Sequence, residues 1–241
     1  MSGILVYTEK EAKRNRFSVQ KFTENLNVCL VDENYRGSAD FVINRTNDYK
    51  IAEFYESRGI RVFNPSALSK IVNDKQACYE FMQSHDIPIM PINYGKVPAV
   101  KKPVNGHGGE GVVMINSPEP FEKNYVYQKP CDTPGKDVRV WVIGGEIIAS
   151  ILRESKTDFR SNYCLGGRAE VYSLSPEEKS LVKKVIRLVD SDYIGIDFLF
   201  NNNQPVFNEI EDTVGARMVY DKTDIDILSL YCDYIKKEMN L

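Results

Sequence analysis

The sequence has 241 residues and a mass of 27.5 kDa, which allows one large domain or two small packed ones. Hydrophobic residues make up 42% and charged residues 27% of the chain, a composition that excludes disordered, collagen-like and coiled-coil proteins. The 31 lysines and arginines against 34 aspartates and glutamates give a net charge of −3, which disfavours a strongly basic nucleic-acid-binding module.

Membrane and metal-cluster classes are also disfavoured. No run of about 18 apolar residues occurs, and the first ten residues lack the basic and apolar regions of a signal peptide. Five cysteines without a C-x-x-C pair and only two histidines, His85 and His107, argue against a zinc cluster and exclude a multi-histidine metal site. The odd number of cysteines favours a reducing compartment, so we expect a cytoplasmic protein.

The first 65 residues alternate between short apolar runs and segments with helical spacing. The runs predicted as strands are 4–7, 28–31, 41–43 and 60–63, and the predicted helices are 11–26 and 49–57. Buried strands separated by helices predict a short N-terminal parallel-sheet α/β domain over residues 1–65. Ser66, after the Asn-Pro break, is expected to cap the next helix.

From residue 66 onward the pattern predicts two helices, then strands and glycine turns, and again helix. The predicted helices are 67–71, 74–85, 175–190 and 224–239, and the predicted strands are 100–104, 111–115, 125–128, 138–143, 146–152, 194–200 and 206–211. Ser175 before Pro176 is expected to cap the most clearly amphipathic helix. The fold class is therefore α/β (α+β).

A glycine-rich segment, residues 105–111 (NGHGGEG), is called the glycine loop below. It matches G-x-G-x-x-G through Gly106, Gly108 and Gly111 and has a further glycine at Gly109. A dinucleotide-binding fold would require a helix after this motif, but a β-branched run follows, which predicts a strand–loop–strand unit. Its backbone N–H groups could converge on phosphate oxygens. The alternative is a flexible hairpin turn, which requires fewer glycines.

Two lysines are placed to complement such a loop. Lys102 ends the strand that enters the loop, and Lys75 begins the preceding helix. An ammonium group neutralises phosphate oxygens as a point charge, although a solvated surface position is the alternative for each lysine. Lys101 is expected to face solvent, because neighbours on a strand point to opposite faces.

The predicted hairpin 194–211 carries three carboxylates on one face. Glu209 and Glu211 are two residues apart, and pairing of Phe200 with Val206 would place Asp197 opposite Glu209. Like charges opposite one another destabilise a sheet, and a divalent cation would remove the conflict. Oxygen ligands favour Mg²⁺ over Zn²⁺. A solvated polar face is the alternative.

Together these motifs resemble the ATP-grasp superfamily, and within it the RimK-like carboxylate–amine ligases. The motifs that carry the resemblance are NRT at 44–46, NDK at 73–75, KP at 102–103, GHGGEGV at 106–112, QKP at 128–130, DVRV at 137–140, ILR at 151–153, DFRSN at 158–162, GID at 195–197 and NEIE at 208–211. The resemblance implies an ATP-grasp domain over 66–241, with a flap subdomain at about 66–130 and a metal-site subdomain at about 131–241.

The resemblance also implies site residues and cofactors. ATP would be bound by Lys75, Lys102, Gly106, Gly108, Gly109, Gly111, Gln128, Lys129, Pro130 and Asp137. Mg²⁺, or alternatively Mn²⁺, would be bound by Asp197, Glu209 and Glu211. The family usually has Asn at the position of Glu211, so the number or affinity of metal ions could differ. The catalytic candidates are Arg153 for the transferring phosphoryl group or the oxyanion, and Arg160 and Asn162 for the substrate carboxylate.

The expected activity is ATP-dependent ligation of an amino-acid or peptide carboxylate to an amine through an acyl phosphate. Two alternatives stay open, a phosphotransferase that stops at phosphorylation and a non-catalytic nucleotide-binding protein. The expected partners are a small-molecule or peptide carboxylate and an amine, without nucleic acid or membrane, and a homodimer is compatible with the resemblance.

Overall fold

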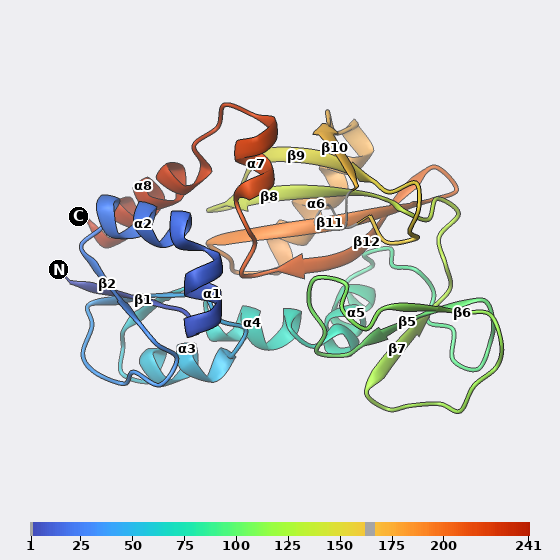
Figure 1. Ribbon diagram of the computed structural model, residues 1–241, viewed down its shortest axis with the longest axis horizontal. Helices are drawn as coiled ribbons and strands as arrows, with labels where there is room; N and C mark the ends of the chain where they lie inside the picture. Colours follow the sequence, from blue (N-terminus) through green and yellow to red (C-terminus); the bar gives the residue numbers. More distant parts are fainter. Residues whose placement is uncertain (1, 162–166) are drawn as a thin grey trace.

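The computed structural model describes residues 2–161 and 167–241, which form three β-sheets (Figure 1). The first sheet is parallel, with the strand order β2-β1-β3-β4. Its strands are β1 (Gly3–Val6), β2 (Val28–Val31), β3 (Phe41–Asn44) and β4 (Arg61–Phe63). Strands β1 and β3 are buried along their whole length, which explains why they read as uninterrupted apolar runs. The predicted parallel α/β unit is confirmed.

The helices of this region follow the predicted spacing with two corrections. They are α1 (Glu9–Arg14), α2 (Arg16–Asn25), α3 (Tyr49–Glu56), α4 (Ser66–Val72) and α5 (Lys75–Ser84). The single helix predicted over 11–26 is wrong, because Asn15 ends α1 and its side-chain amide donates to the Glu11 carbonyl. The cap predicted at Ser66 is also wrong: Pro65 is the N-cap, and Ser66 donates to the Glu56 carboxylate.

The second sheet has three antiparallel strands in the order β6-β5-β7. They are β5 (Ala99–Pro103), β6 (Val113–Ile115) and β7 (Tyr125–Gln128). The glycine loop joins β5 to β6, so the predicted strand–loop–strand unit is confirmed.

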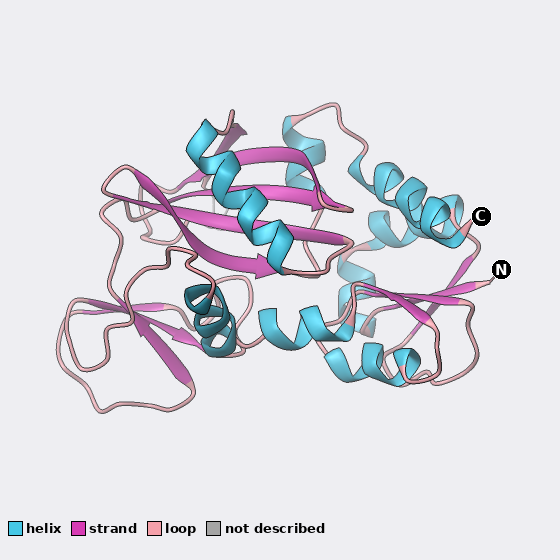
Figure 2. Ribbon diagram, turned by 180° about the vertical axis from the view of Figure 1, so that it is seen from behind, coloured by secondary structure: helices cyan, strands magenta, loops and turns pink. Residues whose placement is uncertain are grey.

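The third sheet has five antiparallel strands in the order β10-β9-β8-β11-β12. They are β8 (Lys136–Ile143), β9 (Glu146–Glu154), β10 (Arg168–Val171), β11 (Tyr193–Asn201) and β12 (Gln204–Glu211). Helix α6 (Pro176–Leu188) lies across one face of this sheet (Figure 2). The predicted cap is confirmed, because Ser175 and Glu178 form a reciprocal capping box. Helices α7 (Arg217–Lys222) and α8 (Ile227–Met239) follow β12; α7 and β10 were not predicted.

The parallel sheet and the five-stranded sheet share one apolar core. Phe41 and Phe63 of the first sheet belong to the same buried cluster as Trp141, Tyr193 and residues of α8. Figure 1 shows α8 beside α2, and the two helices pack against each other. No described helix is both long enough and apolar enough to cross a membrane.

Asn64 is the polar joint between these two sheets. It follows β4 and is only 4% exposed. Its side-chain amide donates to the carbonyls of Tyr193 (2.8 Å) and Asp212 (2.9 Å), and its side-chain oxygen accepts from the backbone N–H groups of Asp192 (2.6 Å) and Tyr193 (3.0 Å). One side chain therefore satisfies four buried backbone groups of the five-stranded sheet and the loops at its ends.

We expect Asn64→Ala to lower the free energy of unfolding by about 3 kcal/mol or more, because it leaves these buried groups without partners. Urea unfolding followed by circular dichroism measures the change, with the exposed Asn124→Ala as the matched control. A change for Asn64→Ala as small as that of the control would contradict the role of this joint.

Candidate functional site

A cleft of about 1240 Å³ is lined by all three sheets. Its walls come from the loops that follow β1 and β3, from the glycine loop and β5, and from the five-stranded sheet. Helix α6 covers the other face of that sheet (Figures 1 and 2). Of the predicted site residues, all line this cleft except Gly111 and Asn162, and Asn162 lies outside the described residues.

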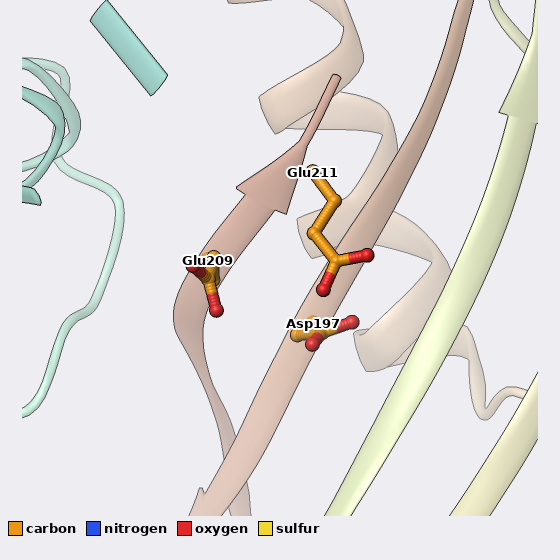
Figure 3. A group of neighbouring side chains, drawn as sticks. All are labelled: Asp197, Glu209 and Glu211. Carbon is orange, nitrogen blue, oxygen red and sulfur yellow. The ribbon is translucent and has the colours of Figure 1, made fainter. Parts of the chain in front are cut away.

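The three predicted metal-binding carboxylates lie together on this face. Asp197 on β11 and Glu209 and Glu211 on β12 each offer an oxygen, and these oxygens lie within 4.8 Å of one another. Figure 3 shows Glu211 extending from β12 toward Asp197 on the neighbouring strand. These three residues are called the carboxylate cluster below. A donor set of carboxylate oxygens only, on the wall of a large cleft, fits Mg²⁺.

The hairpin register that forms the cluster was predicted only in part. Asp197 lies opposite Glu209 as expected. The pairing of Phe200 with Val206 is wrong, because Val206 lies opposite Leu199. Asn201 pairs with Gln204, so the turn consists of Asn202 and Asn203. The predicted pairing would have left a turn one residue longer.

A β-bulge compensates for the tighter turn. Asn202 and Asn203 have positive φ values of 51° and 59°, as the favoured two-residue hairpin turns require. The register then shifts next to Asp197, where Asn208 is the extra residue of β12. The Asn208 side-chain oxygen accepts a hydrogen bond of 2.8 Å from Lys102 Nζ. The bulge thus directs a polar side chain toward the lysine at the opposite wall.

Two arginines on the adjoining strands bind two members of the cluster, Asp197 and Glu211. Arg139 on β8 donates to Asp197 through Nε and Nη2 (both 2.7 Å) and to Glu211 through Nη1 (2.6 Å) and Nη2 (2.5 Å). Arg153 on β9 donates to Asp137 through Nε and Nη2 (both 2.6 Å) and to Asp197 through Nη2 (2.7 Å). These bidentate contacts form one continuous network across four strands.

Arg139 was not predicted as a site residue. The signal was available in the sequence, because Asp137 and Arg139 are two residues apart on a strand and therefore share a face.

The network keeps the central carboxylate ionised. Burial alone would raise the pKa of Asp197, but the adjacent Arg139 and Arg153 lower this pKa to about 2. Burial raises the pKa of Glu211, and the positive charge of Arg139 opposes that shift.

Lys75 and Lys102 lie on the opposite wall of the cleft, close to the cluster. Lys75 begins α5, and its Nζ lies 2.8 Å from Glu209 Oε1 and also donates to the Gly106 carbonyl. Lys102 Nζ lies 3.1 Å from the Tyr79 hydroxyl. Burial lowers the pKa of Lys102 from 10.5 to about 8, so its charge is sensitive to mildly alkaline pH.

The prediction that Lys101 faces solvent is wrong. Its side chain is 10% exposed and its Nζ binds Glu119 (2.7 Å) and Glu122. The alternation along β5 is nevertheless present, because Lys101 pairs with these glutamates while Lys102 turns to the cleft.

The glycine loop contacts Lys75 through the Gly106 carbonyl and lines the same cleft as Lys102. Gly108, Gly109 and Gly111 have φ values of 61°, 76° and 70°, a backbone conformation that other residues rarely adopt. Arg160 Nη1 donates to the Gly109 carbonyl (3.2 Å) while its other nitrogens bind Asp158. Arg160, predicted to bind the substrate carboxylate, is thereby in contact with the loop predicted to bind phosphate.

The predicted adenine-binding residues line the cleft at the end of β7, where Gln128 is the last residue of the strand. The Gln128 amide donates to the Met90 carbonyl (3.1 Å), and the Lys129 N–H donates to the Pro91 carbonyl (2.8 Å). Pro130 lines the cleft beside them. The structure brings these three residues together on one wall of the cleft.

Comparisons with known proteins identify the family to which these motifs belong. The family model described as the RimK-like ATP-grasp domain matches residues 70–235. A probable alpha-L-glutamate ligase of Maridesulfovibrio salexigens is 33% identical over 155 residues, 59% of this chain and 52% of that protein. The ribosomal protein bS6–L-glutamate ligase of Escherichia coli is 29% identical over 209 residues, 76% of this chain and 70% of that protein.

Solved structures show the same fold. The ATP-grasp ligase PsnB, complexed with a phosphomimetic variant of its minimal precursor, Mg and ADP, matches with a TM-score of 0.73 and 15% identity over 99% of each chain. The predicted ATP-grasp fold is thus confirmed. The chain spans about half the length of the first of the curated relatives.

The pKa of Lys102 predicts how nucleotide binding depends on pH. We expect the affinity for ADP to fall roughly tenfold between about pH 7.5 and 9.5, because the ammonium group loses its proton near pH 8. Lys102→Met should bind ADP more weakly at pH 7.5 and lose most of this dependence. Calorimetric titration measures both, and Lys101→Met, next along the strand, is the control. Parallel profiles for the wild type and Lys102→Met would show that another group controls binding.

Proposed function

Because the chain belongs to the RimK-like ATP-grasp family, we propose that it is an ATP-dependent carboxylate–amine ligase. The observation that carries the proposal is the position of Lys75 and Lys102 between the glycine loop and the carboxylate cluster. Cations and backbone N–H groups on one side and acidic oxygens on the other are what a triphosphate and its magnesium ion require.

In the proposed complex, Lys75 and Lys102 bind phosphate oxygens of ATP and the glycine loop covers them. Gln128, Lys129 and Pro130 contact the adenine. Asp137, which the resemblance places among the ATP-binding residues, contributes by orienting Arg153, because both of its carboxylate oxygens accept hydrogen bonds from that arginine. Asp197, Glu209 and Glu211 hold Mg²⁺, with Mn²⁺ as an alternative. Bound Mg²⁺ would neutralise phosphate charge and align the transferring group.

The proposed reaction has two steps. An oxygen of the substrate carboxylate attacks the γ-phosphorus of ATP, an O–P bond forms, and the bond to the β–γ bridging oxygen breaks to release ADP. An amine nitrogen then attacks the acyl carbon and loses a proton, and phosphate leaves with the electron pair of the C–O bond. The sum is ATP, acid and amine converted to ADP, phosphate and amide.

The arginines divide the remaining roles. Arg160 and Asn162 are proposed to bind the substrate carboxylate. Arg153 uses Nε and Nη2 for Asp137 and Asp197, so Nη1 is the atom left to contact a phosphoryl oxygen or the oxyanion. Fixed donors of this kind stabilise charge that develops in the transition state.

The relatives indicate the class of substrate. Those reported above are named for glutamate or for ribosomal protein bS6, and the PsnB complex contains a precursor. We therefore propose that the acid is an amino acid or peptide and the amine a small molecule or peptide.

The proposal keeps the division of the chain into residues 1–65, about 66–130 and about 131–241, each of which contains one sheet. It also includes a homodimer, and the cytoplasm as the compartment, since the four described cysteines are free thiols and the reaction uses ATP.

A panel of amino acids and short peptides, incubated with ATP and Mg²⁺ and analysed by mass spectrometry, tests the activity. The proposal expects one ADP and one phosphate for each amide formed. A phosphorylated acid without an amide would indicate a phosphotransferase, and tight ATP binding without turnover would indicate a non-catalytic protein. Either outcome overturns the ligase proposal.

We expect Glu209→Gln to lower the rate of amide formation by about 100-fold or more, because it removes one charged ligand of the metal and the partner of Lys75. Steady-state ADP release in the identified reaction measures this loss. The exposed Glu170→Gln, which removes a surface ion pair with Arg168, is the control and should keep the full rate. An unchanged rate for Glu209→Gln would exclude it from the site.

A further inference from the structure

We propose that Arg139 is the resident counter-cation of the carboxylate cluster and that it makes divalent-cation binding depend on nucleotide. The inference rests on the proposed function only in taking the cluster as the metal site. It concerns Arg139, which lies in the DVRV motif but to which neither the resemblance nor the comparisons assign a role.

Arg139 occupies the cluster more fully than a surface ion pair would. It contacts both oxygens of Asp197 and both oxygens of Glu211, at distances between 2.5 and 2.7 Å. Its side chain is 11% exposed, and Asp197 is almost completely buried. A divalent cation that binds Asp197 and Glu211 has to share or take over oxygens that the guanidinium group already contacts, and it meets the positive charge of that group.

The charges around the cluster are balanced. Four carboxylates are present: Asp137, Asp197, Glu209 and Glu211. Three cations, Lys75, Arg139 and Arg153, form ion pairs with them. The fourth cation, Lys102, donates to Asn208, the neighbour of Glu209 on β12. A site with a net charge near zero offers a lone divalent cation little attraction beyond the ligand atoms themselves. Neutralising Arg139 would leave one uncompensated negative charge there.

A nucleotide changes this balance. Its phosphates would bring several negative charges to Lys75 and Lys102, the two lysines that line the cleft beside the cluster. Lys75 now bridges Glu209 and the Gly106 carbonyl, and a phosphate oxygen can replace either contact. Binding of metal and nucleotide together therefore changes the net charge of the site little, because the phosphates offset the charge of the metal ion. The metal ion alone has to compete with Arg139.

Titration with Mn²⁺ alone, with free Mn²⁺ followed by electron paramagnetic resonance, tests the inference in the full chain. We expect the wild type to bind Mn²⁺ weakly without nucleotide and at least about tenfold more tightly with ADP. Arg139→Gln should bind Mn²⁺ without nucleotide at least about tenfold more tightly than the wild type. The exposed Arg168→Gln is the control and should not differ from the wild type.

A second pair of variants decides the question if Arg139→Gln does not fold, since the loss of one partner from a buried ion pair is strongly destabilising. Glu211→Gln leaves Arg139 with one carboxylate fewer, and the double variant Arg139→Gln/Glu211→Gln restores the charge balance. We expect the double variant to bind Mn²⁺ more tightly than Glu211→Gln alone. Equal affinities would overturn the inference, as would tight binding of Mn²⁺ by the wild type without nucleotide.

These measurements need no acid or amine substrate. Absence of an amide product would therefore count against the proposed function and not against the role of Arg139. If ADP does not bind, the nucleotide dependence of metal binding fails together with the proposed function. The comparison of wild type and Arg139→Gln without nucleotide still decides whether Arg139 opposes metal binding.

Discussion

The cleft face of the five-stranded sheet depends on the carboxylate of Asp197, which bridges two arginines from two other strands. A buried carboxylate is costly to desolvate, and only well-aligned charge-assisted hydrogen bonds can offset that cost. Arg139 lies directly opposite Asp197 across the β8–β11 pair, and Arg153 lies opposite Asp137 across the β8–β9 pair. The registers of β8 with β9 and β11 place these side chains opposite one another, and the ion pairs in turn stabilise those registers.

The same network connects the fold to the chemistry. The opposite face of the sheet packs on α6 through apolar side chains, so the polar residues are confined to the cleft side. Around Asp197, the β-bulge of β12 turns Asn208 toward Lys102, and Glu209 meets Lys75. A nucleotide in the cleft would thus contact a wall whose charges are already positioned by pairing with one another, which lowers the cost of organising the site.

The sequence predicted much of this arrangement for reasons that can be named. Continuous apolar runs identified the parallel strands, Ser175 identified the start of α6, and the spacing of Glu209 and Glu211 identified their common face. These features are local, because each depends on periodicity or on a cap within a few residues.

Features that depend on contacts between distant residues were not predicted. The turn at Asn202 and Asn203 is one residue tighter than expected, and only the three-dimensional pairing shows that a bulge restores Asp197 to Glu209. Lys101 is buried because Glu119 and Glu122 fold back over it. The sequence places Arg139 on the same strand face as Asp137, but its pairing with Asp197 and Glu211 depends on residues that lie 58 and 72 positions away along the chain.

The most direct test of the account is the fate of a carboxylate oxygen during turnover. The acid substrate, once identified, is labelled with ¹⁸O in its carboxyl group and converted with ATP and the amine, and the released phosphate is analysed by mass spectrometry. The account predicts that each phosphate carries one oxygen from the labelled carboxylate, because that oxygen bridges carbon and phosphorus before the amine attacks. Phosphate without label, formed together with the amide, would contradict phosphoryl transfer to the carboxylate at this site.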